Sequence, residues 1–324
     1  MKKHYFCTLF DKNYLLKGVV MLRSLDQHCS GAHVFVLCMD EQTQLLLMKL
    51  KLPFITCIPL ALIEDDQLLA VKKNRTIAEY CWTFSPCLPW YVLDKYPDIG
   101  AITYVDADLM FYSSLQPLFD EIGNASIAAI EHRFIPRLRH LEAKGRFCVE
   151  WVGFRRDAEG MACLRRWRKQ CIEWCYARLE EGRMGDQKYL DEWPARYSSL
   201  HVLQYPGAGI APWNYSQYAF SCDANGCPSV DGLPLIFYHF HQFQLLDNGK
   251  FDRLSDYYTV ERAEPAQIYE MYEDRLKSVL AEVRAVQPDF SSGFRVAAEI
   301  ASRRWVQRHI PRPVIEWFHR LKRN

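Results

Sequence analysis

No stretch of the chain approaches the ~18 consecutive apolar residues that a membrane-spanning helix needs, although 49% of the 324 residues are hydrophobic. The first residues lead directly into a predicted strand, without an apolar segment long enough for a signal peptide. A chain of this length can bury one large α/β core, with or without an appendage. We therefore expect a cytoplasmic protein with a main domain in residues 1–260 and a C-terminal helical region in residues 261–324.

The twelve cysteines include no Cys-x-x-Cys pair and lie mostly inside apolar segments. Cys222 and Cys227 resemble half of a zinc site, but no second pair completes the four ligands that a structural zinc ion takes. Dispersed cysteines without a signal peptide are typical of a reducing compartment. We expect free thiols.

One Asp-x-Asp motif follows an apolar segment near the middle of the sequence. Residues 102–105 are rich in β-branched and aromatic side chains, which predicts a buried central strand ending at Asp106 and Asp108. Residues i and i+2 of an extended segment point the same way, so both carboxylates can face one hard cation. The spacing equally suits a turn after a strand. A ligand site is expected here because ligands bind outside the carboxyl ends of the strands in open α/β sheets.

The amino-terminal residues predict a strand, a polar loop and a helix. The strand covers residues 5–9, the loop contains Asp11, Asn13 and Tyr14, and the apolar helix covers residues 15–25. This unit opens many nucleotide-binding sheets. Tyr14 could stack on a base whose edge a carboxylate reads, and the alternative is a solvated turn.

Further motifs lie downstream. Asp186 and Gln187 follow a glycine, and Gly207 and Gly209 permit tight turns or close approach of the backbone to a ligand. Residues 235–243 predict an apolar strand that carries His239 and His241 on one face. A histidine on such a strand is more often a core residue, but an Asp-x-Asp site still needs a third ligand.

The order of these motifs resembles the GT-A glycosyltransferases, and most closely family 8 with its lipopolysaccharide-synthesis relatives. The resemblance covers residues 4–243. It implies an α/β fold of the Rossmann-like GT-A type, with a mixed, mostly parallel sheet flanked by helices. It also implies an enzyme that transfers a hexose from a nucleotide diphosphate sugar, expected to be a UDP-sugar, to a glycan or lipid-linked glycan acceptor, with retention of configuration.

The resemblance further implies roles for individual residues. A Mn²⁺ or Mg²⁺ ion is expected on Asp106, Asp108 and His239, with His241 as the alternative third ligand. Asp186 and Gln187 are expected beside the donor sugar and its reacting carbon, as the catalytic pair. The nucleotide contacts are expected from a wider group: Thr8, Asp11, Asn13, Tyr14, Arg75, Asp106, Gly207 and Gly209.

The chain departs from the family pattern at three places. Residues 147–150 read Phe-Cys-Val-Glu where the family has Phe-Asn-x-Gly, so a sugar-binding asparagine is missing. The arginine that usually precedes the Asp-x-Asp has no counterpart other than Arg75. Residues 242–245 read Gln-Phe-Gln-Leu where the family has a Lys-Pro-Trp segment after its metal-binding histidine. These departures affect the sugar and phosphate contacts and leave the metal ligands intact.

The carboxyl-terminal residues are strongly basic. Residues 303–323 hold seven Lys or Arg against Glu316 alone, so the remainder of the chain has 33 basic and 38 acidic residues. Residues 296–323 repeat apolar side chains at helical intervals on either side of Pro311 and Pro313. This pattern predicts an in-plane helical segment on the anionic inner face of the cytoplasmic membrane, and the alternative is a helix docked on the acidic body.

Two other functions are weighed against the transferase. A sugar-phosphate nucleotidyltransferase would need a glycine-rich basic loop after the first strand, but residues 9–13 contain no glycine. A non-catalytic GT-A-like membrane-associated protein would explain the basic tail but not the carboxylates and histidine at strand ends. No nucleic-acid partner is expected.

Overall fold

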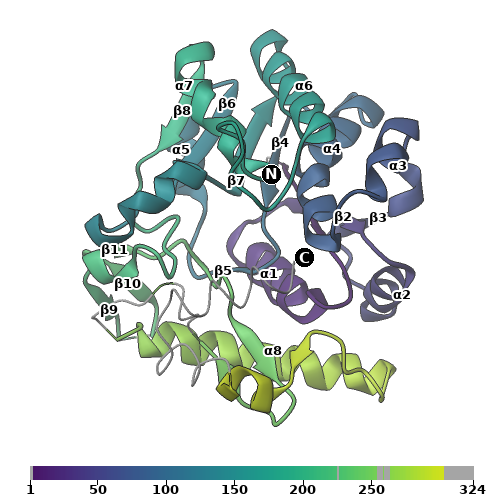
Figure 1. Ribbon diagram of the computed structural model, residues 1–324. Coiled ribbons are helices and arrows are strands. Elements are labelled where there is room, and N and C mark those ends of the chain that lie inside the picture. The colour runs from purple at the N-terminus through teal and green to yellow at the C-terminus, as the bar shows by residue number, and fades with distance from the viewer. Residues whose placement is uncertain (1–2, 225, 254–257, 259–262, 303–324) are drawn as a thin grey trace.

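The computed structural model describes residues 3–224, 226–253, 258 and 263–302 (Figure 1). Its centre is a seven-stranded sheet in the order β3-β2-β1-β4-β7-β6-β8. The strand β7 runs antiparallel to its neighbours β4 and β6, and the other adjacent pairs are parallel. The expected mixed, mostly parallel sheet is therefore confirmed. Its strands are β3 (Ile55–Pro59), β2 (Ala32–Cys38), β1 (His4–Phe10), β4 (Ala101–Val105), β7 (Phe147–Arg155), β6 (Ile127–Glu131) and β8 (Leu200–Leu203).

Helices cover both faces of this sheet because its strands are apolar on both sides. Along β1, Phe6 points into one hydrophobic core and Cys7 into the other. The first core lies under α1 (Leu15–His28), α2 (Glu41–Leu50), α5 (Gln116–Ile122) and α8 (Ala266–Val286). The second lies under α3 (Asp66–Lys72), α4 (Ile77–Lys95), α6 (Ala158–Glu173) and α7 (Trp193–Arg196).

Local sequence explains where several helices begin. The Asp40 side chain accepts a hydrogen bond from the backbone N–H of Thr43 and so caps α2. Thr76 and Glu79 form a reciprocal capping box at the start of α4. Helix α6 ends at Glu173. One reason is that the Arg75 guanidinium donates to the Ile172 carbonyl, which satisfies an acceptor in the last turn of α6.

Small sheets surround the main one. The strand β5 (Leu109–Phe111) pairs with β12 (Phe237–His239), and β13 (Gln244–Leu246) lies between β14 (Phe251–Asp252) and β15 (Phe294–Arg295). A third sheet contains β9 (Phe220–Cys222), β10 (Pro228–Val230) and β11 (Leu233–Pro234). The strand predicted over residues 235–243 is therefore interrupted after His239, so His239 and His241 do not share one regular strand face.

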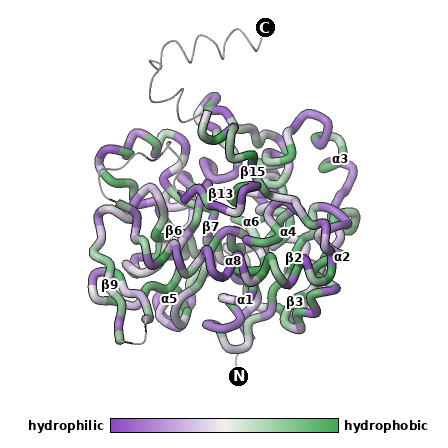
Figure 2. Tube along the Cα trace, turned by 90° about the horizontal axis from the view of Figure 1, so that it is seen from below, coloured by the Kyte–Doolittle hydropathy of each residue, from purple (hydrophilic) through white to green (hydrophobic). Residues whose placement is uncertain are grey.

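The C-terminal part of the described chain packs on the body. Helix α8 lies along the lower side of the molecule in Figure 1 and is viewed from below in Figure 2. Its Glu282 forms an ion pair with Arg23 of α1, and its apolar face contributes Leu276 and Val279 to the first core. The division at residue 260 stays a prediction. The basic residues 303–324 lie outside the described residues.

None of the described helices is both long enough and apolar enough to cross a membrane.

Candidate active site

The pairing of β5 with β12 brings His239 to the Asp-x-Asp motif. Asp106 and Asp108 lie between the end of β4 and the start of β5, and His239 pairs with Leu109 in the antiparallel ladder. The backbone N–H of Phe240 donates to the Asp108 carbonyl, at 2.9 Å. His239 and Asp108 are 131 residues apart in the sequence, and main-chain hydrogen bonds as well as their side chains hold them together.

Asp106, Asp108 and His239 can share one metal ion. The Nε2 atom of His239 lies 3.0 Å from Oδ1 of Asp108 and 4.0 Å from Oδ2 of Asp106. One ligand atom from each residue lies within 4.8 Å of the other two. Carboxylate oxygens suit Mg²⁺ and Mn²⁺, and imidazole nitrogen suits Mn²⁺ well. These residues thus fit the divalent ion that the sequence predicts.

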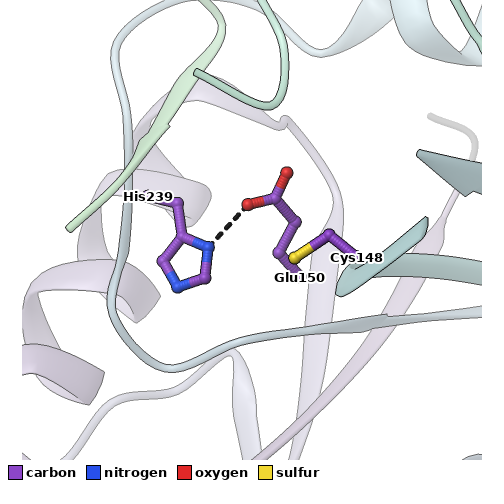
Figure 3. Close-up of side chains that lie close together, drawn as sticks. All are labelled: Cys148, Glu150 and His239. Carbon is purple, nitrogen blue, oxygen red and sulfur yellow. Dashed lines mark hydrogen bonds and ion pairs between the residues drawn. The ribbon is translucent and has the colours of Figure 1, made fainter. Parts of the chain in front are cut away.

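A second group of possible ligands lies on the other side of the same imidazole ring. Cys148 and Glu150 of β7 approach His239 there (Figure 3). The His239 Nδ1 atom is 2.6 Å from Oε2 of Glu150, which is the distance of a short hydrogen bond. Nδ1 therefore donates to Glu150, and Nε2 is left on the side of the two aspartates.

Burial and the neighbouring charges perturb the pKa values of these groups. Burial alone would raise the pKa of Asp108, but His239 and Lys17 hold it well below its usual range. Burial alone would lower the pKa of His239, but Asp108 and Glu150 raise it well above its usual value. Burial raises the pKa of Asp106 to about 7, against the effect of His239 and with that of Asp108. Asp106, Asp108 and His239 thus form a network of interacting charges. A cation that binds there would compete with protons for the same ligand atoms.

The loop between β1 and α1 reaches the same place. Asp11 accepts hydrogen bonds from the backbone N–H groups of Asn13 and Tyr14, so its carboxylate shapes the turn. The Tyr14 side chain is 44% exposed. Burial of its hydroxyl, with the charges of Asp108 and Asp106, raises the pKa of Tyr14 above its usual range. Tyr14 therefore borders the group formed by Asp106, Asp108 and His239, which we call the metal-ligand cluster.

Asp186 lies at another edge of this region. Its Oδ2 atom accepts a 2.6 Å hydrogen bond from Ser85, and its carbonyl accepts one from the Trp167 indole. The hydroxyl of Tyr104 donates to Asp106, and burial followed by the charges of Asp106 and Asp186 raises the pKa of Tyr104 well above its usual value. Tyr104 thus lies near both carboxylates. Burial raises the pKa of Asp186 to about 6.

Other predicted residues have contacts within the protein. The Gln187 amide donates to the Lys144 carbonyl, and the Arg75 guanidinium donates to Thr83 and to the Ile172 carbonyl. Thr8 is completely buried, and its hydroxyl has no hydrogen-bond partner among the described residues.

The two glycines are close to protein atoms. A Cβ on Gly207 would lie 2.1 Å from the Pro234 carbonyl oxygen. A Cβ on Gly209, which has φ +68°, would lie 3.0 Å from the Glu150 carboxylate. At both glycines the backbone lies close to another part of the chain. At Gly209 the absence of a side chain leaves room for the Glu150 carboxylate, which is hydrogen-bonded to His239.

His241, the alternative third ligand, is differently placed. Its Nδ1 lies 2.9 Å from the Tyr258 hydroxyl, and its ring contacts Trp213. Burial and the charge of His239 lower the pKa of His241 to about 3. The described groups of possible metal ligands contain His239 and not His241.

Three contacting residues were not expected from the sequence: Glu150, Lys17 and Ser85. Each lies inside a strand or helix, in β7, α1 and α4 respectively, and meets its partner only after folding. The sequence could have indicated a role for Glu150, because it is an acidic residue in the otherwise apolar segment 147–154. A charge at such a position needs a buried partner.

The Glu150 contact predicts a change in metal affinity. Glu150→Gln should weaken Mn²⁺ binding by about 10- to 100-fold, because a neutral amide no longer selects the His239 tautomer with a free Nε2. Mn²⁺ titration followed by electron paramagnetic resonance measures this. Cys148→Ser is the matched control and should keep the wild-type affinity, and an unchanged affinity in Glu150→Gln would contradict the assignment.

The Asp186 environment predicts a pH-dependent gain of stability. Because the pKa of Asp186 rises from 3.8 to about 6 on folding, its ionised form opposes folding, and this cost grows as pH rises from about 4 to above 6. Asp186→Asn, which still accepts from Ser85, should raise the free energy of unfolding at pH 8 by up to about 3 kcal/mol. The gain should shrink at pH 5. Thermal unfolding at both pH values tests this, with exposed Asp98→Asn as control, and a gain independent of pH would disprove it.

Known proteins resemble this chain in sequence and fold. Residues 6–179 match the model of the glycosyl transferase family 8. Two uncharacterized proteins of Bacillus subtilis (strain 168) are similar over most of their length. YfnD is 35% identical over 298 residues, covering 91% of this chain and 95% of YfnD, and YfnF is 32% identical over 295 residues, covering 88% and 96%.

Solved glycosyltransferase structures share the fold. An active-site mutant of LgtC has a TM-score of 0.53 at 14% identity, covering 86% of this chain and 95% of LgtC. The glycosyltransferase GlyE of Streptococcus pneumoniae TIGR4 has a TM-score of 0.50 at 16% identity, covering 91% of this chain and 66% of GlyE. The mixed sheet and its flanking helices are thus those of a GT-A fold, and the chain is a glycosyltransferase that belongs to glycosyl transferase family 8.

Proposed function

We propose that this enzyme transfers a hexose from a UDP-sugar to a glycan acceptor, with a divalent ion bound by Asp106, Asp108 and His239. The observation that carries the proposal is the convergence of these three ligands beside Tyr14 and Asp186. Family 8 membership supports a nucleotide-sugar donor. The resemblance of the motifs to lipopolysaccharide-type enzymes supports uridine as the base.

The protein's contribution is positioning and charge. Asp106, Asp108 and His239 hold the ion, and Glu150 keeps the His239 ring in place from behind. When bound, the ion supplies Lewis-acid stabilisation of the leaving diphosphate. The Asp11 turn presents Tyr14 toward the base, so the nucleotide lies across the loop between β1 and α1.

Asp186 is proposed to act at the sugar. Its carboxylate is nearly buried, held by Ser85, and close enough to Asp106 to raise the pKa of that residue. A retaining reaction by double displacement needs a carboxylate against the anomeric carbon. A front-face reaction needs only that Asp186 stabilise positive charge on the sugar. Either role would make Asp186 catalytic, and the resemblance of the motifs supports Gln187 as its catalytic partner.

The acceptor is proposed to be a lipid-linked glycan, such as a lipopolysaccharide core, on the cytoplasmic face of an anionic membrane. The support is the basic composition of residues 303–323 and the resemblance of the motifs.

One assay separates these proposals. UDP release is measured with Mn²⁺ over a panel of nucleotide sugars, with soluble glycans and with lipid-linked glycans in anionic vesicles. We expect turnover with a UDP-sugar, a faster rate with the vesicle-bound acceptor, and a product whose anomeric configuration matches the donor by NMR.

Variants assign the activity to the site. Asp108→Asn should lower turnover by at least about 100-fold because it removes a ligand of the ion, and exposed Asp98→Asn should leave turnover unchanged. Pyrophosphate release from UTP and a sugar 1-phosphate would instead identify a nucleotidyltransferase. Absence of turnover with every donor would reject the transferase proposal, and equal rates with both acceptor forms would reject the membrane-bound acceptor.

A further inference from the structure

Lys17 is a buried cation beside the metal-ligand cluster. It lies in the first turn of α1, and only 6% of the residue is exposed. Its Nζ atom is 3.9 Å from Oδ2 of Asp108 and 4.6 Å from the centre of the Tyr14 ring. Within the described part of the chain no atom lies at hydrogen-bonding distance from this ammonium. An ammonium has three donors, and a phosphate oxygen could accept from those that the described residues leave unused.

A second cation approaches from the C-terminal part of the chain. Strand β15 pairs with β13, and Gly293, just before β15, packs so closely on the β1–α1 loop that a Cβ would lie 2.2 Å from the Asn13 carbonyl oxygen. This contact holds Arg295 near Lys17. Burial, opposed by Asp108, and then the charge of Arg295 lower the pKa of Lys17.

Arg295 is exposed, and its guanidinium has no ion pair among the described residues. The positive charges of Lys17 and Arg295 repel each other, and an anion bound beside both would reduce this repulsion. Residues 242–245, which follow the histidine segment, contain no cation. The positive charge at this edge of the site therefore comes from α1 and β15.

We propose that Lys17 and Arg295 bind the diphosphate of the donor, on the side of the metal-ligand cluster that faces α1. The inference rests on the proposed function, because a divalent ion on Asp106 and Asp108 would bring the donor diphosphate close to Lys17. The Lys17 ammonium is pre-positioned for a phosphate oxygen by Asp108 and by the Tyr14 ring. Arg295 then adds a planar donor group at the exposed end.

Lys17→Met tests the buried position, because methionine keeps much of the aliphatic stem without the charge. Affinities for UDP and for inorganic pyrophosphate, each with Mn²⁺, are measured by calorimetry. Both should fall by at least about 10-fold, while uridine binding followed by NMR stays unchanged. The ligand-free variant should unfold at the same temperature as the wild type or higher, because a buried ammonium without hydrogen bonds has been removed.

Arg295→Gln tests the exposed position without risk to the fold. It should weaken pyrophosphate and UDP binding by a few-fold and reduce the salt dependence of that binding. The matched control is Arg275→Gln, an exposed arginine of α8 that lies beside His28 at the other end of α1, and its affinities should equal those of the wild type.

Three outcomes overturn the inference. If Lys17→Met lowers the unfolding temperature and leaves pyrophosphate affinity intact, Lys17 is a structural partner of Asp108. If both variants bind UDP and pyrophosphate as the wild type does, the diphosphate lies elsewhere while the proposed function stands. If the wild type binds neither ligand with Mn²⁺, the inference fails together with the proposed function.

Discussion

The site depends on the two hydrogen-bonding directions of one buried imidazole. His239 faces Glu150 with Nδ1 and Asp108 with Nε2, at 2.6 Å and 3.0 Å. Glu150 is completely buried, so its carboxylate would be a costly isolated charge without His239. The pairing of β5 with β12 supplies the histidine, and the central strand β7 supplies the glutamate. Each element contributes to a contact that neither could make alone.

The two sides of the His239 ring have different neighbours. Glu150 and Cys148 lie behind the ring, and the two aspartates, Tyr14 and Lys17 lie at the carboxyl ends of β4 and β1. On the side of the aspartates, two charged groups are unfavourably buried. The pKa of Asp186 is raised, and the Lys17 residue is nearly buried. Strain of this kind is typical of sites whose charges are completed by a ligand.

Much of the framework could be predicted from local pattern. The apolar segments around Phe6 and Tyr104 form parallel strands close to their expected bounds, because fully buried strands need continuous apolar sequence. The Asp-x-Asp motif and His239 were also predicted together, and their order along the chain was the signal. The resemblance to family 8 was confirmed by the family match over residues 6–179.

The remaining features depend on contacts between distant segments. Glu150 and His239 are 89 residues apart, so no local pattern predicts their hydrogen bond. Gly209 leaves room for the Glu150 carboxylate and the Arg133 guanidinium, which come from distant parts of the chain. Helix α6 ends at Glu173, and the distant Arg75 donates to the Ile172 carbonyl in its last turn. Periodicity predicts an element, but such tertiary partners decide where it ends.

The most direct test is the position of a bound ion. Crystals of the full chain soaked with Mn²⁺ and UDP would locate the metal by anomalous scattering. We expect one manganese peak within coordination distance of Asp106, Asp108 and Nε2 of His239, with Nδ1 still hydrogen-bonded to Glu150. A peak between Cys148, Glu150 and Nδ1, or one beyond coordination distance of both aspartates, would contradict it.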